Sequence, residues 1–311
     1  MRQEAAYCAG PSMRRILILV ICVACGYCGG QSPTGPTPGP PSVSPPPSVP
    51  PSGPQIFAGA GDIAMCDVNS LATAALLDRI GGLIFTLGDN AYFHGSRAEY
   101  RDCYDTTWGR HKGKTFPVPG NHEYESSGAA PYYEYFGELA SGPLGDGYYS
   151  FEVGDWHVVA LNSNVAVGST SPQGAWLRSD LASSRARCTL AYWHHPLFTS
   201  GPNGDTQSMR EFWRILYDAS AEIVLSAHDH MYERFGPQDP DGRADAARGI
   251  RQFIVGTGGA FLRQPVTLHP NSENRIISFG VLKLTLSSDR YQWEFVPVAG
   301  GATDGGSGVC H

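Results

Sequence analysis

From residue 55 onward, short apolar runs recur along the chain, and Gly, Asp, Asn or His follows the apolar part of each of the first six. These runs have the length of β-strands and are bounded by residues that favour turns. They read QIFAGAGD, GLIFTLGDN, KTFPVPGNHE, WHVVALNSN, CTLAYWHHP and AEIVLSAHDH, and the runs RQFIVGTGG, VLKLTLSS and YQWEFVPV follow them. The pattern is typical of a chain that places polar side chains where buried strands end.

Helical patterns lie between several of the apolar runs. They are SLATAALLDRI, with Ser70 as its expected N-cap, PQGAWLRSDLASS and DTQSMREFWRILYDAS. Strands that alternate with helices predict an α/β domain. The last two runs have no helix between them, so we expect them to pair antiparallel and to make the sheet mixed.

Six polar residues follow five of the apolar runs at the point where each strand is expected to end. Open α/β sheets bind their ligands at this edge. His228 and His230 are one residue apart, so in an extended chain both rings point to the same side. Each residue alone has a simpler reading, since Asp62 or Asp89 could cap a turn. Together they predict one shared crevice: Asp62, Asp89, Asn121, His194, His228 and His230.

Length and charge limit the class of protein. The chain has 311 residues, of which 41% are hydrophobic and 16% charged, so it can bury the core of one large domain or two small ones. The net charge is −7, and no basic run is long enough to track a phosphate backbone. We therefore expect no nucleic-acid partner.

Residues 1–30 are predicted to be a targeting segment. A basic start at Met13–Arg15 precedes ILILVICVAC, which is too short to span a bilayer as a mature helix. Cleavage before Cys25 would resemble bacterial lipoprotein processing, although Cys22 stands where such sites usually have Leu. Two outcomes stay open, a membrane tether through lipidated Cys25 and simple secretion. Residues 31–54 are rich in Pro, Ser, Gly and Thr, and they predict either an extended linker or a tail without function.

Four cysteines remain beyond the linker. An even number in an exported chain predicts two disulfides, with three possible pairings. Zinc is disfavoured because the spacings contain no CxxC pair. Cys66 and Cys103 follow the first two strands, whose ends are neighbours, while Cys188 opens a strand and Cys310 lies on the C-terminal tail. We expect Cys66 to pair with Cys103, and Cys188 with Cys310.

The polar blocks also carry a resemblance. GD at 61, GDNAY at 88, GNHE at 120, HHP at 194 and AHDHMYER at 227 together resemble the calcineurin-like metallophosphoesterases, over residues 55 to about 298. Tyr92 lies three residues after Asp89, as in the purple acid phosphatase branch, and Ala64 occupies a place where many other members have His. Ala227 and Ala191 depart from the pattern by small apolar replacements. The resemblance implies a mixed β-sheet sandwich flanked by helices, in four αββα layers, over a catalytic domain of residues 55–311.

The resemblance further implies two metal ions. One would be ferric iron, for which a phenolate is a suitable hard ligand. The other would be a divalent ion, Fe²⁺, Zn²⁺ or Mn²⁺, with Asp89 bridging the two. The implied ligands of the ferric ion are Asp62, Asp89, Tyr92 and His230, and those of the divalent ion are Asp89, Asn121, His194 and His228.

Two further histidines adjoin implied ligands. His122 matches the GNHE histidine that contacts the substrate phosphate and assists the leaving group in the family. His195 follows a ligand, and it is expected behind the metal site or in catalysis. Tyr232, Glu233 and Arg234 also match the family block, and we expect them to fix the loop behind the site.

The function implied is that of an exported binuclear phosphatase. It would hydrolyse a small-molecule phosphate monoester by attack of metal-bound hydroxide, with His122 serving the departing alkoxide. The expected location is periplasmic, on the cell surface as a lipoprotein, or secreted. Two alternatives stay open: a phosphodiesterase of the same superfamily, and a tethered protein that binds metal and phosphate without turnover. Specificity is expected from loops such as FHGSRAEYRDCYDTTWGRHKGK and ESSGAAPYYEYFG.

Overall fold

The computed structural model describes residues 53–142 and 145–311. The predicted targeting segment, Cys25 and nearly all of the predicted linker lie outside these ranges. Within them, every helix is too short or too polar to cross a membrane.

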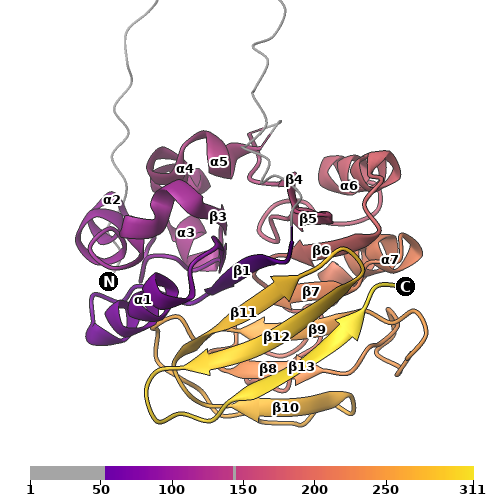
Figure 1. Cartoon of the computed structure of the whole chain (residues 1–311). Coiled ribbons are helices and arrows are strands. Elements are labelled where there is room, and N and C mark those ends of the chain that lie inside the picture. The colour runs from indigo at the N-terminus through magenta and orange to yellow at the C-terminus, as the bar shows by residue number, and fades with distance from the viewer. Residues whose placement is uncertain (1–52, 143–144) are drawn as a thin grey trace, which may run out of the picture. The chain divides into compact units, whose positions relative to one another are not determined.

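Two β-sheets form the centre of the domain (Figure 1). The six-stranded sheet has the order β13-β12-β11-β1-β2-β3, with β1 (Gln55–Ala60), β2 (Leu83–Leu87), β3 (Thr115–Val118), β11 (Gly280–Leu286), β12 (Arg290–Pro297) and β13 (Asp304–Val309). The seven-stranded sheet has the order β10-β8-β9-β7-β6-β5-β4, with β4 (Tyr149–Val153), β5 (Trp156–Ala160), β6 (Cys188–Tyr192), β7 (Ile223–Ser226), β8 (Tyr232–Phe235), β9 (Arg251–Val255) and β10 (Ser272–Ile276). Both sheets combine parallel and antiparallel pairs, as expected.

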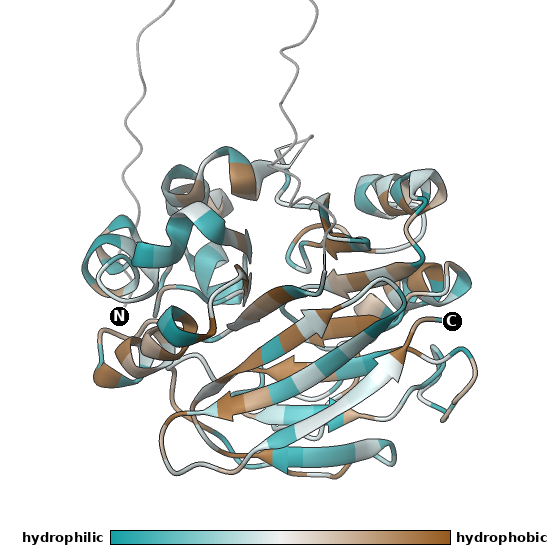
Figure 2. Ribbon diagram, in the orientation of Figure 1, coloured by the Kyte–Doolittle hydropathy of each residue, from teal (hydrophilic) through white to brown (hydrophobic). Residues whose placement is uncertain are grey.

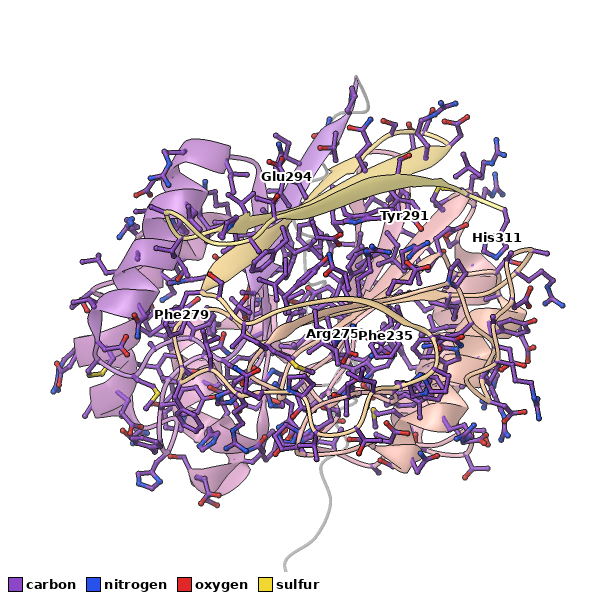
Figure 3. The ribbon with its side chains drawn as sticks, turned by 90° about the horizontal axis from the view of Figure 1, so that it is seen from below. Phe235, Arg275, Phe279, Tyr291, Glu294 and His311 are labelled. Atoms are coloured by element: carbon purple, nitrogen blue, oxygen red, sulfur yellow. A yellow bond between two sulfur atoms is a disulfide. The ribbon has the colours of Figure 1, made fainter. Side chains whose placement is uncertain are left out.

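Helices cover the outer faces of the sheets. They are α1 (Val68–Ile80), α2 (Arg97–Glu99), α3 (Asn121–Glu125), α4 (Ala130–Phe136), α5 (Glu138–Ser141), α6 (Pro172–Ser183) and α7 (Arg210–Asp218). Short π and 3₁₀ turns are η1 (Tyr100–Tyr104), η2 (Trp108–Lys114), η3 (Ser127–Ala129) and η4 (Gln207–Met209). Seen from below, the indigo helices and the salmon helices lie on opposite flanks of the strands (Figure 3). The predicted four-layer sandwich is confirmed.

Two apolar clusters hold these layers together. Between the sheets, Phe57 of β1 meets Phe85 of β2 edge-on at 4.9 Å, and Phe116 stacks on Phe151 at 3.9 Å across the sandwich. A second cluster packs the outer face of β5, β6, β7 and β9 against buried side chains of α6 and α7. Figure 2 shows the matching pattern, with apolar colour along β1 and hydrophilic colour along β10. The sandwich positions the strand ends that carry the polar residues.

Helix α1 begins earlier than expected. Val68 is its first residue, and the carboxylate of Asp67 accepts from the backbone N–H groups of Asn69 and Ser70. The predicted N-cap at Ser70 is therefore wrong, because Asp67 offers an equally good capping oxygen three residues earlier. Ser70 instead lies buried in the first turn.

The apolar patterns missed four strands. β13 reads DGGSGV and β10 reads SENRI, so neither shows an apolar alternation. Each is the edge strand of its sheet, where one flank is free and little burial is needed. The other two strands that the apolar runs did not include are β4 and β8.

Both predicted disulfides are present. Cys66–Cys103 ties the loop after β1 to the η1 turn, and Cys188–Cys310 ties the start of β6 to the tail after β13. The second bond closes a loop of 122 residues, which in the chain-entropy model stabilises the fold by about 4–5 kcal/mol. The first bond lies close to the residues that carry the site.

Candidate metal centre

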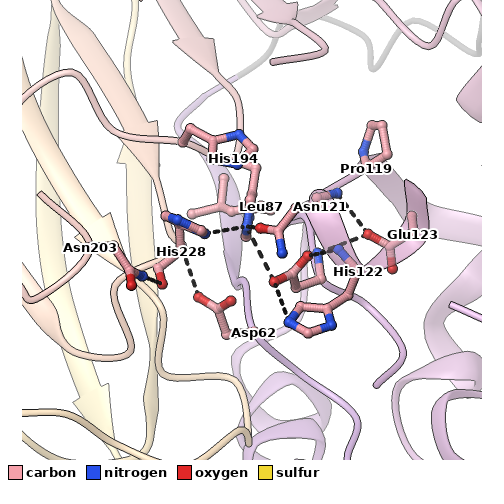
Figure 4. A network of polar contacts seen from close by, with 12 residues as sticks. Asp62, Leu87, Pro119, Asn121, His122, Glu123, His194, Asn203 and His228 are labelled. Carbon is pink, nitrogen blue, oxygen red and sulfur yellow. Dashed lines mark hydrogen bonds and ion pairs between the residues drawn. The ribbon is translucent and has the colours of Figure 1, made fainter. Parts of the chain in front are cut away.

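The predicted site residues come together where strands of both sheets end (Figure 4). Asp62 follows β1, Asp89 follows β2, and Asn121 opens α3 after β3. From the seven-stranded sheet, His194 follows β6, and the segment with His228 and His230 follows β7. The centre therefore spans the sandwich.

Backbone conformation turns three of these residues into the site. Asp62, Asp89 and His228 have φ values of 56°, 51° and 69°. This left-handed region is uncommon for residues other than glycine, though Asp and His adopt it more readily than most. Half of the six non-glycine residues with positive φ in the described ranges thus belong to this centre, which is where strained backbone is expected to concentrate.

One donor set gathers around Tyr92. Its hydroxyl oxygen lies 2.8 Å from Asp62 Oδ1, 3.1 Å from Asp89 Oδ2 and 3.2 Å from His230 Nε2. Tyr92 is 3% exposed, so these atoms are largely shielded from water. The side chains assigned by resemblance to the ferric ion therefore do meet in space.

The second donor set gathers around His194. Its Nε2 lies 3.1 Å from Asn121 Oδ1, 3.2 Å from His228 Nδ1 and 3.3 Å from Asp89 Oδ2. Asp89 Oδ2 thus belongs to both sets, as a bridging carboxylate must. The ligand atoms of Asp62, Asp89 and His194 lie within 4.8 Å of one another.

Backbone carbonyls orient two of the rings. His194 Nδ1 lies 2.7 Å from Leu87 O, and His230 Nδ1 lies 2.7 Å from Phe261 O. A carbonyl oxygen only accepts, so in each ring Nδ1 carries a proton, and Nε2 is the nitrogen that faces the centre and would bind a metal. Metal-ligating histidines commonly have this arrangement.

The charges of the centre call for cations. Burial by itself lowers the pKa of His194, but the carboxylate of Asp89 outweighs it and raises the pKa to about 9. Burial and then the carboxylates of Asp62 and Asp89 raise the pKa of Tyr92 well above its usual value. A phenolate next to two buried carboxylates needs added positive charge. The carboxylate, phenol, amide and imidazole donors gathered here fit metal ions.

His122 lies against both donor sets without joining either. Its backbone N–H donates to Asp89 Oδ1 at 2.9 Å, its Nε2 stands 3.8 Å from Asp89 Oδ2, and its ring lies 4.4 Å from that of Tyr92. Its Nδ1 lies 2.6 Å from Phe93 O. The ring therefore directs Nε2 towards the centre.

His195 occupies a different position. Its Nδ1 pairs with Ser163 Oγ at 2.8 Å, and its ring lies 4.5 Å from that of His228. Burial, followed by the neighbouring rings of His194 and His228, lowers the pKa of His195 to about 2. A neutral ring therefore packs beside His228, and a ring nitrogen of His195 lies within 4.8 Å of ring nitrogens of His194 and His228.

Sequence reasoning missed the carboxylate of Glu123. It is fully buried and accepts from the backbone N–H groups of Asp89 at 2.9 Å, Asn90 at 2.8 Å and Gly120 at 2.7 Å, which clamps the loop after β2 to the loop after β3. A Cβ on Gly120 would stand 2.1 Å from Asp89 Oδ1, so only glycine fits there. Glu123 is the last residue of the GNHE block, so the block itself could have marked it as a site residue.

Asp229 and Glu233 perform a similar task on the other side. Asp229 accepts from Thr199 Oγ1 at 2.6 Å, and Glu233 accepts from the backbone N–H of Ser200 at 2.9 Å. Both carboxylates hold the loop after β6 against the histidine segment. Tyr232 donates to Asp304 at 2.7 Å, away from the centre. Of the block Tyr232, Glu233 and Arg234, Glu233 thus contacts the loop beside the centre, whereas Tyr232 and Arg234 bind Asp304 of β13.

The order of the site residues along the chain matches a known family. The family model described as calcineurin-like phosphoesterase matches residues 57–232, which is more than half of the chain. The chain belongs to the calcineurin-like phosphoesterase family. Within that family, its relatives are purple acid phosphatases, as the GDNAY block indicated.

Two relatives come from Arabidopsis thaliana. Purple acid phosphatase 22 is 27% identical over 254 residues, which cover 77% of this chain and 53% of that protein. Purple acid phosphatase 15 is 28% identical over 225 residues, which cover 61% of this chain and 42% of that protein. The chain thus spans about half the length of the curated relatives it matches.

Solved structures share the fold. A purple acid phosphatase from yellow lupin seeds superposes with a TM-score of 0.69 at 16% identity, covering 85% of this chain and 54% of that one. A dimetal phosphatase from Danio rerio gives 0.56 at 15% identity, covering 81% of this chain and 99% of that one. GAP50, the anchor in the inner membrane complex of Plasmodium, gives 0.63 at 15% identity, covering 84% and 89%.

Proposed function

We propose that the domain of residues 55–311 is a binuclear metal-dependent phosphatase that hydrolyses phosphate monoesters. The observation that carries this proposal is the shared carboxylate. Asp89 Oδ2 lies 3.1 Å from Tyr92 Oη in one donor set and 3.3 Å from His194 Nε2 in the other. Two sets of ligand-type side chains around one carboxylate oxygen are expected for a pair of metal ions, and not for a purely structural salt-bridge network.

The side chains present would hold ferric iron at Asp62, Asp89, Tyr92 and His230, and a divalent ion at Asp89, Asn121, His194 and His228. Such a pair, when bound, lowers the pKa of a water molecule and neutralises charge on the phosphoryl oxygens. Neutral Asn121 limits the negative charge around the divalent ion, which favours binding of an anionic substrate there.

His122 is proposed to handle the proton of the leaving group. Because Phe93 O holds its Nδ1 as a donor, Nε2 is the atom that gives up or takes up a proton on the side of the centre. The proposed role of His195 is to position His228 through ring packing at 4.5 Å, with Ser163 fixing its own orientation. His195 therefore acts through a metal ligand, whereas His122 contacts the substrate.

Export is part of the proposal. The two disulfides favour an oxidising compartment, since thiols are kept reduced in the cytosol. They support the predicted targeting segment at residues 1–30, with a linker over 31–54 and either lipidation at Cys25 or secretion.

Metal analysis combined with turnover tests the proposed function. The purified chain, reconstituted with iron and zinc or manganese, is expected to hold two metals and to hydrolyse 4-nitrophenyl phosphate faster than bis(4-nitrophenyl) phosphate. A preference for the diester would make it a phosphodiesterase. Metal binding without turnover of either would make it a binding protein. A colourless active enzyme with only manganese or zinc would refute the iron assignment alone.

A further inference from the structure

Two aromatic side chains stand exposed beside the metal centre. Among the large apolar side chains that are exposed in the described ranges, Phe93 at 50% and Phe261 at 45% are the aromatic ones. Both are anchored to the centre through their backbone, since Phe93 O accepts from His122 and Phe261 O accepts from His230. An exposed phenylalanine gives up the stabilisation that burial of its ring would provide, so rings held beside a site are candidates for ligand binding.

A positively charged side chain packs on the ring of Phe261. The guanidinium of Arg263 lies 4.9 Å from the centre of the Phe261 ring, which is a cation–π distance. The backbone N–H of Arg263 donates to His230 O at 2.9 Å, so the residue is tied to a proposed metal ligand. The phenylalanine and the arginine together form a flat, positively charged surface.

Arg263 has no carboxylate partner within 4.0 Å in the described part of the chain. By contrast, Arg234 and Arg251 both pair with Glu273. Other described arginines, such as Arg178 and Arg185, also lack such a partner, so what distinguishes Arg263 is its position beside the metal centre. Its guanidinium is oriented by Asn203 Oδ1 at 3.4 Å, and Asn203 donates to His228 O at 2.7 Å. Arg263 is thus linked to both histidines of the segment after β7.

The loops that carry Arg263 and Asn203 also enclose a groove. Its volume is about 410 Å³, and one loop contributes Pro202 and Gly204 while the other contributes Val266 and Leu268. Val266 is 71% exposed. Asp205 and His269 also line the groove, which adjoins the Phe261–Arg263 surface rather than being lined by it.

We propose that Phe261 and Arg263 form a substrate subsite that selects phosphate monoesters with a planar leaving group bearing a second negative charge. The inference rests on the proposed phosphatase function and names its substrate class. The ring of the leaving group would pack on Phe261, and its anionic group would pair with the guanidinium. Arginine binds planar carboxylates in two-pronged fashion and stacks on rings, so Lys would not replace it fully.

Kinetics with matched substrates test the subsite. The substrates are phenyl phosphate, 4-carboxyphenyl phosphate, its longer biphenyl analogue and 4-(aminomethyl)phenyl phosphate. We expect kcat/KM to be highest for one of the two carboxylates, and Arg263→Gln to reduce the carboxylate-to-phenyl ratio about tenfold, mainly through KM. Phe261→Leu should lower kcat/KM for all aryl esters. Arg185→Gln is the control, because Arg185 is exposed and precedes β6 at the end opposite His194.

Binding separates the subsite from turnover. Affinities of benzylphosphonate and 4-carboxybenzylphosphonate for the metal-loaded protein are measured by calorimetry, since a phosphonate cannot be hydrolysed. A carboxylate advantage that Arg263→Gln removes and Arg185→Gln keeps supports the subsite, even if no ester is turned over and the phosphatase function fails. Equal affinities, or equal losses in both variants, overturn the subsite while leaving a measured phosphatase activity intact. If neither phosphonate binds, the subsite is likewise refuted.

Discussion

The domain contains two buried clusters in which a tyrosine hydroxyl donates to an aspartate, and they differ in how the charge is completed. At the metal centre, Tyr92 lies 2.8 Å from Asp62, with Asp89 close by. At the joint of the sheet edges, Tyr232 of β8 lies 2.7 Å from Asp304 of β13. Arg234 donates to Asp304 at 2.7 Å, so this second cluster is neutral by itself.

The source of the compensating positive charge distinguishes the structural cluster at Asp304 from the functional cluster at Tyr92. Arg234 also packs over the Trp293 ring at 5.2 Å, and Asn274 donates to Asp304 at 2.8 Å, which satisfies the carboxylate with protein groups alone. The metal centre has two carboxylates and no Lys or Arg against them in the described ranges. A buried carboxylate pair of this kind is stable when cations complete it.

Removing the central carboxylate of each cluster should give the clearest contrast. Asp89→Ala should lose both metals and all turnover above background, because both donor sets share this residue. Asp304→Ala should keep both metals but destabilise the fold by about 1–3 kcal/mol, since Tyr232, Arg234 and Asn274 lose their shared acceptor while Arg234 keeps Glu273. Metal content and urea unfolding measure the two effects. Retained metal in Asp89→Ala would remove the basis for a shared site.

His122 tests whether groups beside the centre act in chemistry or in metal binding. His122→Ala should keep both metals and slow alkyl phosphates by about 10²–10⁴, the usual worth of general acid catalysis. The loss should be smaller for 4-nitrophenyl phosphate, whose leaving group needs no proton. His194→Ala is the matched control and should deplete the divalent metal. An equal loss on both substrates would assign His122 to phosphate binding instead.

Visible absorption should distinguish Tyr92 of the metal centre from Tyr232 of the structural cluster. Tyr92→Phe should abolish the visible charge-transfer band expected of a ferric phenolate. Tyr232→Phe should leave that band unchanged and cost about 1 kcal/mol of stability, the typical worth of one hydrogen bond. Absorption spectra of the reconstituted proteins decide this. A band that survives in Tyr92→Phe would show that another group generates it.

As the pH falls, Asp304 of the structural cluster should keep its charge longer than most other carboxylates do. Burial opposes ionisation, but hydrogen bonds from Arg234, Tyr232 and Asn274 lower the pKa of Asp304 to about 2. A lowered pKa stabilises the fold above the unfolded value of 3.8, and this contribution disappears as pH falls through 2. Asp304→Asn should therefore flatten the loss of stability between pH 4 and pH 2. The effect is small because the cluster is partly open to solvent. An unchanged slope in acid unfolding would argue against it.

Local sequence determined most of the scaffold and of the metal site. Apolar runs such as LIFTL and WHVVA are buried at nearly every position, and a short continuous apolar run bounded by turn residues predicts such a strand from the sequence alone. Polar residues follow directly where such runs end. This position marked Asp89, after LIFTL, and His194, after CTLAY, as candidate site residues. The motif order then indicated the family, and strand adjacency was enough to pair the four cysteines.

Tertiary structure decided what local patterns cannot encode. Strand β13 has the sequence DGGSGV and exists because β12 offers it a hydrogen-bonding edge, so no periodicity of its own reveals it. The role of Glu123 depends on backbone N–H groups from two loops that only meet after the parallel strands β2 and β3 align. Arg263 and Asn203 are 60 residues apart, and their contact beside His228 follows from two loops folding over the same strand end. Charge completion, which distinguishes the Asp304 cluster from the metal centre, is likewise a property of neighbours in space.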